Sequence, residues 1–111
     1  MQNYKIGKGS EDGYITVNEG IERKTMVYAE KTLLIEMRLK QGKTIPKHKH
    51  PHEQTGYLIS GHIVMIVDEE RNELKTGDSY CFKGNVEHST EILEDSVLVE
   101  VFSPVREEYI V

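Results

Sequence analysis

Three histidines and a glutamine lie close together in residues 42–61, a segment bounded by two glycines. His48 and His50 are two residues apart, a spacing that places both side chains on one face of a β-strand. The proline that follows ends this strand, because it has a fixed backbone angle and no N–H donor, so the chain can fold back and direct Gln54 toward the same point. Imidazole nitrogens and amide oxygens both bind metal ions. These residues predict three of the four ligands of a metal site, and His88 is the candidate for the fourth.

Other residues near this segment are weaker candidates. His52 shares strand parity with His50 and Gln54 and is therefore a rival ligand. It follows the proline, however, where the backbone turns, so we expect it either at the surface or in contact with a metal ligand without binding the ion itself. Glu53 has the opposite parity, and we expect it to be solvated or to orient a ligand histidine by a hydrogen bond. Gly56 has the parity of Gln54, and its missing side chain either leaves space beside the metal or serves packing.

A single carboxylate interrupts the last apolar stretch, residues 96–102. Both faces of this stretch are apolar except at Glu100, which parity places on one face with Leu98 and Phe102. A carboxylate in such surroundings is costly to bury unless it is paired or bound to a ligand. Arg106 follows in a tail that we expect to form one helical turn.

The composition limits the classes of function. With 111 residues, 37% of them hydrophobic and 30% charged, the chain predicts one domain over residues 1–111. The formal net charge of −5 argues against a nucleic-acid partner. No stretch resembles a signal peptide or has the length of a membrane span, so we expect a cytoplasmic protein. The single cysteine, Cys81, cannot form an internal disulfide, and between two aromatic residues we expect it to be a small buried side chain.

Short β-rich runs separated by turn residues predict an all-β sandwich or barrel. The clearest run is 32–40, in which the residues at alternate positions from Leu33 to Leu39 are apolar and share one face. Further strands are expected at 14–17, 24–28, 57–59, 62–67, 79–82 and from His88 onward, with turns at 60–61 and 83–85 and a hairpin closed by 68–73.

Two motifs resemble those of the cupin superfamily. The first reads glycine, five residues, His-x-His, three or four residues, glutamate, six residues, glycine, and it is matched by Gly42, His48, His50, Gln54 and Gly61, with glutamine in place of glutamate. The second is matched by Gly77, Lys83, Asn85 and His88, where the family has proline and glycine at the two middle positions. Asparagine tolerates a left-handed backbone, so we expect the turn to survive. The resemblance implies an antiparallel β-barrel (a double-stranded β-helix, or jelly roll) of six to eight strands with the metal inside its mouth.

A narrower resemblance, to the pectin-degradation cupins, covers residues 20–24, 50–54 and 100–109. Members of that group open the ring of unsaturated monouronates from pectin or alginate to give linear keto-uronates. The resemblance implies a metal held by His48, His50, Gln54 and His88, and a catalytic pair formed by Glu100 and Arg106. Glu100 stands where the family has an aspartate. The extra methylene moves the carboxylate by about one carbon–carbon bond length, a misplacement that can cost on the order of 100-fold in rate.

Three histidines and a glutamine carry no negative charge, so a bound divalent ion keeps its full charge and suits Lewis-acid chemistry on an anionic substrate. Nickel, zinc, iron and manganese are all compatible with these ligands. We therefore expect a metal-dependent enzyme acting on a small acidic sugar or keto acid. In it, Glu100 would be the general acid and base, and Arg106 would bind the substrate carboxylate as a planar fork.

Two other functions use the same residues. An iron- or copper-dependent dioxygenase acting on a flavonol or diketone would have Glu100 as its base. A non-catalytic sugar-binding or sensor module would hold Glu100 in a structural salt bridge with Arg106. In each case we expect a homodimer, because cupins of this size commonly pair their sheets and the final strand is apolar on both faces.

Overall fold

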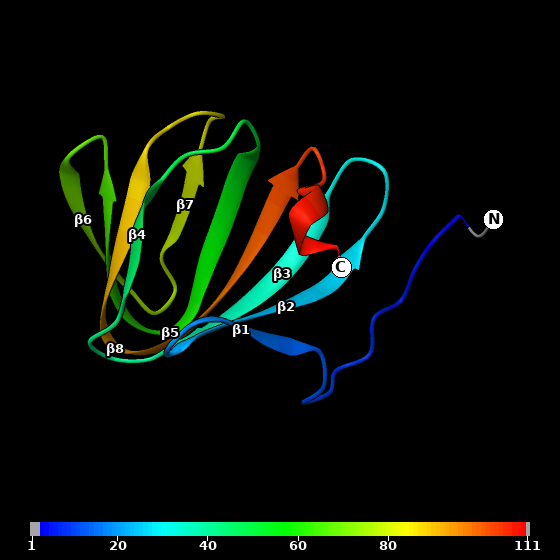
Figure 1. The fold of residues 1–111 in the computed structure, drawn as a ribbon, viewed down its shortest axis with the longest axis horizontal. Coiled ribbons are helices and arrows are strands. Elements are labelled where there is room, and N and C mark those ends of the chain that lie inside the picture. Colours follow the sequence, from blue (N-terminus) through cyan, green and yellow to red (C-terminus); the bar gives the residue numbers. More distant parts are fainter. Residues whose placement is uncertain (1–2, 111) are drawn as a thin grey trace.

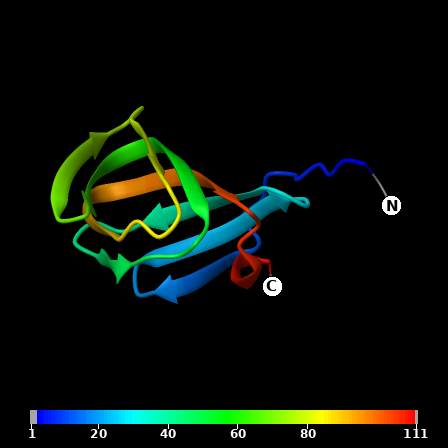
Figure 2. The same cartoon turned by 90° about the horizontal axis from the view of Figure 1, so that it is seen from above.

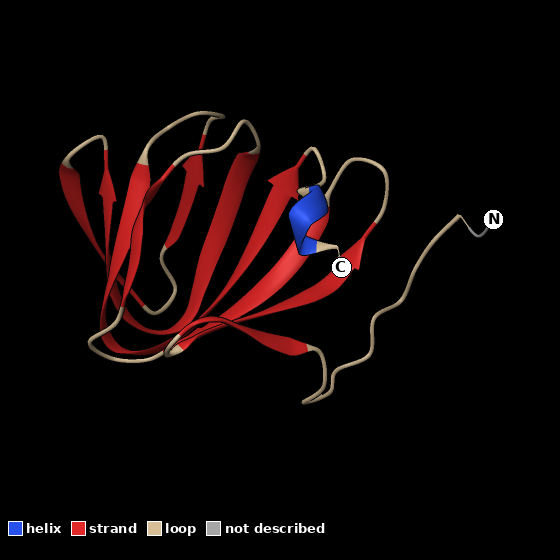
Figure 3. Ribbon diagram, in the orientation of Figure 1, coloured by secondary structure: helices blue, strands red, loops and turns tan. Residues whose placement is uncertain are grey.

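The computed structural model describes residues 3–110, in which eight strands form one antiparallel sheet curled into an open barrel (Figures 1 and 3). Their bounds are β1 Tyr14–Asn18, β2 Ile21–Tyr28, β3 Leu33–Leu39, β4 Thr44–His48, β5 Glu53–Val67, β6 Glu70–Lys75, β7 Ser79–Phe82 and β8 His88–Ser103. A single 3₁₀ turn, Glu107–Tyr109, follows β8. No helix in this described part of the chain is long and apolar enough to cross a membrane.

The two longest strands, β5 and β8, pair with each other from one end to the other and extend through both halves of the barrel. The sheet order is β1-β2-β3-β8-β5-β6, with β4 added to β8 and β7 added to β5. Seen from above, the strands curl around the inside of the barrel, with the C-terminal turn at one side (Figure 2). Residues from β4, β5 and β8 therefore meet inside the barrel, although they are far apart in the sequence.

The alternation predicted for β3 is confirmed: Leu33, Ile35, Met37 and Leu39 are at most 8% exposed and form part of the core. β8 pairs with β3 and contributes Leu98 and Phe102 to the same core, each 1% exposed. This packing holds the inner face of β8, and with it the position of Glu100.

The turn predicted at residues 60–61 is wrong, because β5 continues through it. Gly61 has a φ of 112°, and the pairing with β8 shifts register on either side of it. A Cβ atom at this position would lie 2.0 Å from Oγ of Ser96. The glycine therefore makes a bulge that bends the strand without ending it.

Two other expectations are corrected in detail. The hairpin expected over residues 68–73 turns within two residues, Asp68 and Glu69, which both have positive φ angles of 49° and 72°, and the polar strand β6 begins immediately after them. Cys81 is exposed, not buried. It alternates with Tyr80 and Phe82 along β7, and because those two take the inward positions, Cys81 must face outward. The left-handed turn expected at Asn85 is confirmed, with a φ of 65°.

Candidate functional site

Three histidines meet at one end of the barrel. His48 is the last residue of β4 and pairs in register with His88, the first residue of β8. His50 lies two residues beyond β4, so the expectation that it shares a strand with His48 is wrong, but its side chain still reaches the same place. One nitrogen from each of the three rings lies within 4.8 Å of the others. His50 and His88 are buried, and His48 is partly exposed.

Each of the three rings is oriented by a backbone carbonyl. The Nδ1 atoms lie 2.8–3.1 Å from carbonyl oxygens two residues away along the chain: Pro46 for His48, His52 for His50 and Val86 for His88. A carbonyl only accepts hydrogen bonds, so Nδ1 carries the proton in each ring and Nε2 keeps a free lone pair. Metal-binding histidines are commonly held in this way. Nε2 of His88 is buried without a hydrogen-bond partner among the described residues.

Gln54, 4% exposed, joins this group from β5. Its Nε2 donates to Oε2 of Glu100 at 2.5 Å, which turns its Oε1 toward Nε2 of His50 at 2.9 Å. Both facing atoms are acceptors, and they repel each other unless a cation or a proton lies between them. Burial lowers the pKa of His50, and the charge of Arg106 lowers it further, which disfavours a proton there. Burial also lowers the pKa of His88 to about 4. These donor atoms therefore fit a divalent metal ion.

Glu100 lies beside Gln54 and is 5% exposed. Its Oε2 accepts hydrogen bonds from Gln54 and from the hydroxyl of Tyr80, both at 2.5 Å. Burial raises the pKa of Glu100, and the two hydrogen bonds and the charge of Arg106 oppose part of this rise. The result is a carboxyl group whose proton is held more tightly than usual at the edge of the histidine cluster.

The sequence did not point to Tyr80, because its role depends on how three strands align. Gly56 on β5 pairs with Glu100 on one side and with Tyr80 on the other. A Cβ atom at Gly56 would lie 2.1 Å from Cζ of Tyr80. The ring of Tyr80 thus occupies the room over Gly56 and reaches Glu100 across it. Of the two alternatives for Gly56, open space beside the metal or packing, this contact favours packing, because the Tyr80 ring fills the room that the missing side chain leaves.

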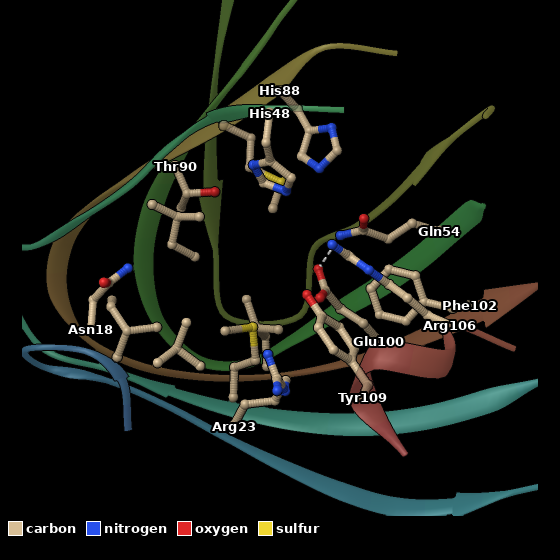
Figure 4. Close-up of a pocket in the computed structure, with 16 residues that line it drawn as sticks. Asn18, Arg23, His48, Gln54, His88, Thr90, Glu100, Phe102, Arg106 and Tyr109 are labelled. Carbon is tan, nitrogen blue, oxygen red and sulfur yellow. Dashed lines mark hydrogen bonds between the residues drawn. The ribbon is translucent and has the colours of Figure 1, made fainter. Parts of the chain in front are cut away.

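A cavity of about 70 Å³ lies inside the barrel, lined at one end by His48, Gln54 and His88 (Figure 4). Glu100, Arg106 and Tyr109 line the side that faces the C-terminal turn, and Asn18 and Arg23 line it further from the histidines. Arg106, whose side chain is 12% exposed, pairs with Glu108 through Nε at 3.1 Å and not with Glu100. Its Cζ lies 4.2 Å from the centre of the Tyr109 ring.

The remaining candidates lie outside the cluster. The ring of His52 is 5.6 Å from that of His50, centre to centre, and its backbone carbonyl is what orients His50. Glu53 is exposed. Sequence reasoning missed Arg23 because the strand was expected to begin at residue 24. With β2 beginning at Ile21, which is buried, parity alone places Arg23 on the inner face.

Comparison with known proteins shows the family to which the chain belongs. The family model described as a cupin domain matches residues 35–103. The chain is 31% identical over 112 aligned positions to the pectin degradation protein KdgF of Dickeya dadantii (strain 3937), covering 99% of this chain and 100% of that protein. The structure of this chain superimposes on that of KdgF from Halomonas sp. with a TM-score of 0.91 and 24% sequence identity. The match covers 97% of this chain and 100% of the Halomonas chain.

An RmlC-like cupin from Shewanella frigidimarina is similar to the same extent, with a TM-score of 0.89, 23% identity, and coverage of 99% of this chain and 100% of that one. These two likenesses concern the fold. The cupin match spans more than half of the chain, and the likeness to the Dickeya protein extends over nearly all of it. The chain therefore belongs to the cupin superfamily and, within it, to the family of the pectin degradation protein KdgF.

Proposed function

We propose that this protein is a metal-dependent cupin that opens the ring of unsaturated monouronates to give linear keto-uronates, an isomerisation. The observation that carries the proposal is a pair of contacts made by Gln54. Its Oε1 faces Nε2 of His50 and its Nε2 donates to Glu100, so Gln54 connects a candidate metal ligand to a buried carboxyl group. The Dickeya relative is a pectin degradation protein, which supports uronates as the substrate class.

His48, His50, Gln54 and His88 would hold the ion, for which nickel, zinc, iron and manganese all remain candidates. A divalent ion at this place would supply Lewis-acid chemistry to oxygen atoms of the substrate. Because none of the four side chains brings a negative charge, the pocket would favour an anionic substrate.

Glu100 would move the proton. Ring opening breaks the bond between the anomeric carbon and the ring oxygen, the anomeric hydroxyl loses its proton and becomes an aldehyde, and the former ring oxygen becomes a ketone as the neighbouring alkene carbon gains a proton. One proton leaves an oxygen and one reaches a carbon, so a single carboxyl group with a raised pKa can serve both steps. Arg106, largely buried beside the same cavity, would hold the substrate carboxylate.

The test is ring opening of unsaturated galacturonate, followed by ¹H NMR with protein loaded with each candidate ion. We expect Glu100→Gln to lower the rate by about 100-fold or more while the metal content stays the same, as loss of a general acid and base does. A Glu100→Gln variant that works at the wild-type rate would overturn the mechanism. Consumption of oxygen during turnover would instead select a dioxygenase, and sugar binding without turnover that is insensitive to chelators would select a binding module.

We also propose that the protein is a homodimer. The outer face of β8 carries Val97, Val99 and Val101, and Val101 is 37% exposed. On the neighbouring strand β5, Tyr57 and Ile59 are 49% and 43% exposed. A second copy of the chain would cover these apolar side chains.

A further inference from the structure

Arg23 occupies an inward-facing position of the barrel wall. It lies on β2 two residues after Ile21, which is 1% exposed, and it pairs across the sheet with Met37, which is 8% exposed. Its side chain reaches into the same cavity as Glu100 and Arg106 (Figure 4). Arg23 is half-buried, and a charged group on the inner face of a strand is favoured when a partner balances its charge.

No carboxylate in residues 3–110 forms a salt bridge with Arg23. The other three arginines of the chain each pair with a carboxylate: Arg38 with Glu11 and Glu36, Arg71 with Glu91, and Arg106 with Glu108. Within the described chain, no hydrogen bond or salt bridge is formed by the guanidinium of Arg23. Its close contact is with an aromatic ring, since its Cζ lies 3.7 Å from the centre of the Tyr109 ring. The five N–H donors of a guanidinium are thus available to a ligand.

Tyr109 brings the second arginine into the same place. Its ring contacts Arg106 at 4.2 Å as well as Arg23, and its backbone carbonyl accepts a hydrogen bond from the hydroxyl of Thr25 on β2. The C-terminal turn is therefore fastened to β2 with two guanidiniums in contact with one ring. The carboxylate of Glu108 that pairs with Arg106 belongs to a side chain that is 61% exposed, so it does not fill the cavity.

We propose that Arg23 is a substrate-binding residue that, together with Arg106, which contacts the same Tyr109 ring and lines the same cavity, forms a two-arginine subsite for the carboxylate of the substrate. The identity of the substrate as a monouronate rests on the proposed function. The subsite itself rests on a guanidinium that has no hydrogen-bond or salt-bridge partner among residues 3–110. A planar carboxylate matches the donor fork of a guanidinium, whereas a neutral sugar gives it no charge to balance. Arg23 thus selects uronates over neutral hexoses.

The experiment measures binding apart from turnover, using saturated galacturonate and galactose in NMR titrations of the whole protein. We expect Arg23→Gln to weaken the binding of galacturonate by about 10- to 100-fold, the usual effect of losing a charge-assisted hydrogen bond, and to leave galactose unchanged. Arg23→Lys, which keeps the charge without the fork, should recover part of the affinity. Arg71→Gln, which removes an exposed arginine outside the cavity, is the matched control. Thermal unfolding of each variant verifies that it is folded.

Kinetics separate this proposal from the proposed function. With unsaturated galacturonate, Arg23→Gln should raise KM by a similar factor and change kcat little, because a group that binds the carboxylate equally in the ground and transition states affects KM alone. If galacturonate binding depends on Arg23 but the protein does not open the ring, the proposed subsite is correct and the proposed function is wrong. Ring opening with an unchanged KM in Arg23→Gln, or equal loss of galacturonate and galactose binding, would overturn the subsite.

Discussion

At the scale of single residues, Tyr80 affects the protonation of Glu100, because its hydroxyl donates a hydrogen bond to the carboxylate at 2.5 Å. A hydrogen bond to the charged form favours that form and lowers the pKa, so this contact opposes the rise caused by burial. Tyr80→Phe removes the donor and leaves the ring over Gly56. The pKa of Glu100 should then rise further, and the low-pH limb of the kcat profile should move to higher pH.

The measurement is the pH dependence of kcat for wild type and Tyr80→Phe. Cys81→Ala is the control, since it changes the next residue of β7, which faces outward. A limb that stays in place, or moves to lower pH, would mean that Glu100 is not the group that titrates in the rate.

The candidate ligands could be predicted from the sequence because they depend on local spacing and on motifs with fixed lengths. His48, His50 and Gln54 lie within seven residues, and the motif spacing indicated His88. Tyr80 and Tyr109 could not be found in this way. Their positions in the site arise from contacts across strands and with the C-terminal turn, such as the alignment of Gly56 between Glu100 and Tyr80. The register between strands that are distant in the sequence cannot be derived from one short segment.

At the scale of elements, the strands with alternating patterns were predictable and the bend in β5 was not. β3 shows strict alternation, which places its apolar side chains in the core. β5 contains Ser60 and Gly61, residues typical of turns, but its pairing with β8 continues past them with shifts in register. The polar strand β6 has no alternation at all, and it exists because the two-residue turn at Asp68 and Glu69 places it against β5.

The bend in β5 depends on Gly61, and a substitution tests how much. Gly61→Ala would place a Cβ atom 2.0 Å from Oγ of Ser96 and 2.6 Å from its Cα, at a φ of 112° that alanine rarely adopts. We expect a loss of about 2–4 kcal/mol in the free energy of unfolding. Urea unfolding measures it.

Gly77→Ala is the matched control for this substitution. Gly77 also has a positive φ, 95°, but nothing lies within 4 Å of the Cβ position. It should therefore report the backbone strain alone, about 1–2 kcal/mol. If both variants lose the same free energy of unfolding, the close approach of β5 and β8 at Ser96 adds nothing to the cost of replacing Gly61.

At the scale of the whole molecule, the barrel separates two surfaces of β8. Its inner face carries Leu98, Glu100 and Phe102, all at most 5% exposed, and so supplies both the core and the carboxyl group of the site. Its outer face carries valines at the alternate positions 97, 99 and 101. In the sheet, Val99 pairs with Glu36 of β3 on one side and Tyr57 of β5 on the other. The same strand therefore forms the site on one face and an apolar surface on the other.

The proposed homodimer makes that outer surface testable. Light scattering at micromolar concentration should give twice the 12.8 kDa mass of one chain. Val101→Lys places a charge on the apolar face, where burial in an interface would be costly, and should convert the dimer to a folded monomer with unchanged secondary structure by circular dichroism. Leu93→Lys changes a similarly exposed apolar residue (41% against 37%) eight positions earlier on β8 and should remain dimeric. A monomeric wild-type protein would contradict the proposed dimer. Dissociation by both variants alike would mean that the contact between the two copies is not centred on Val101.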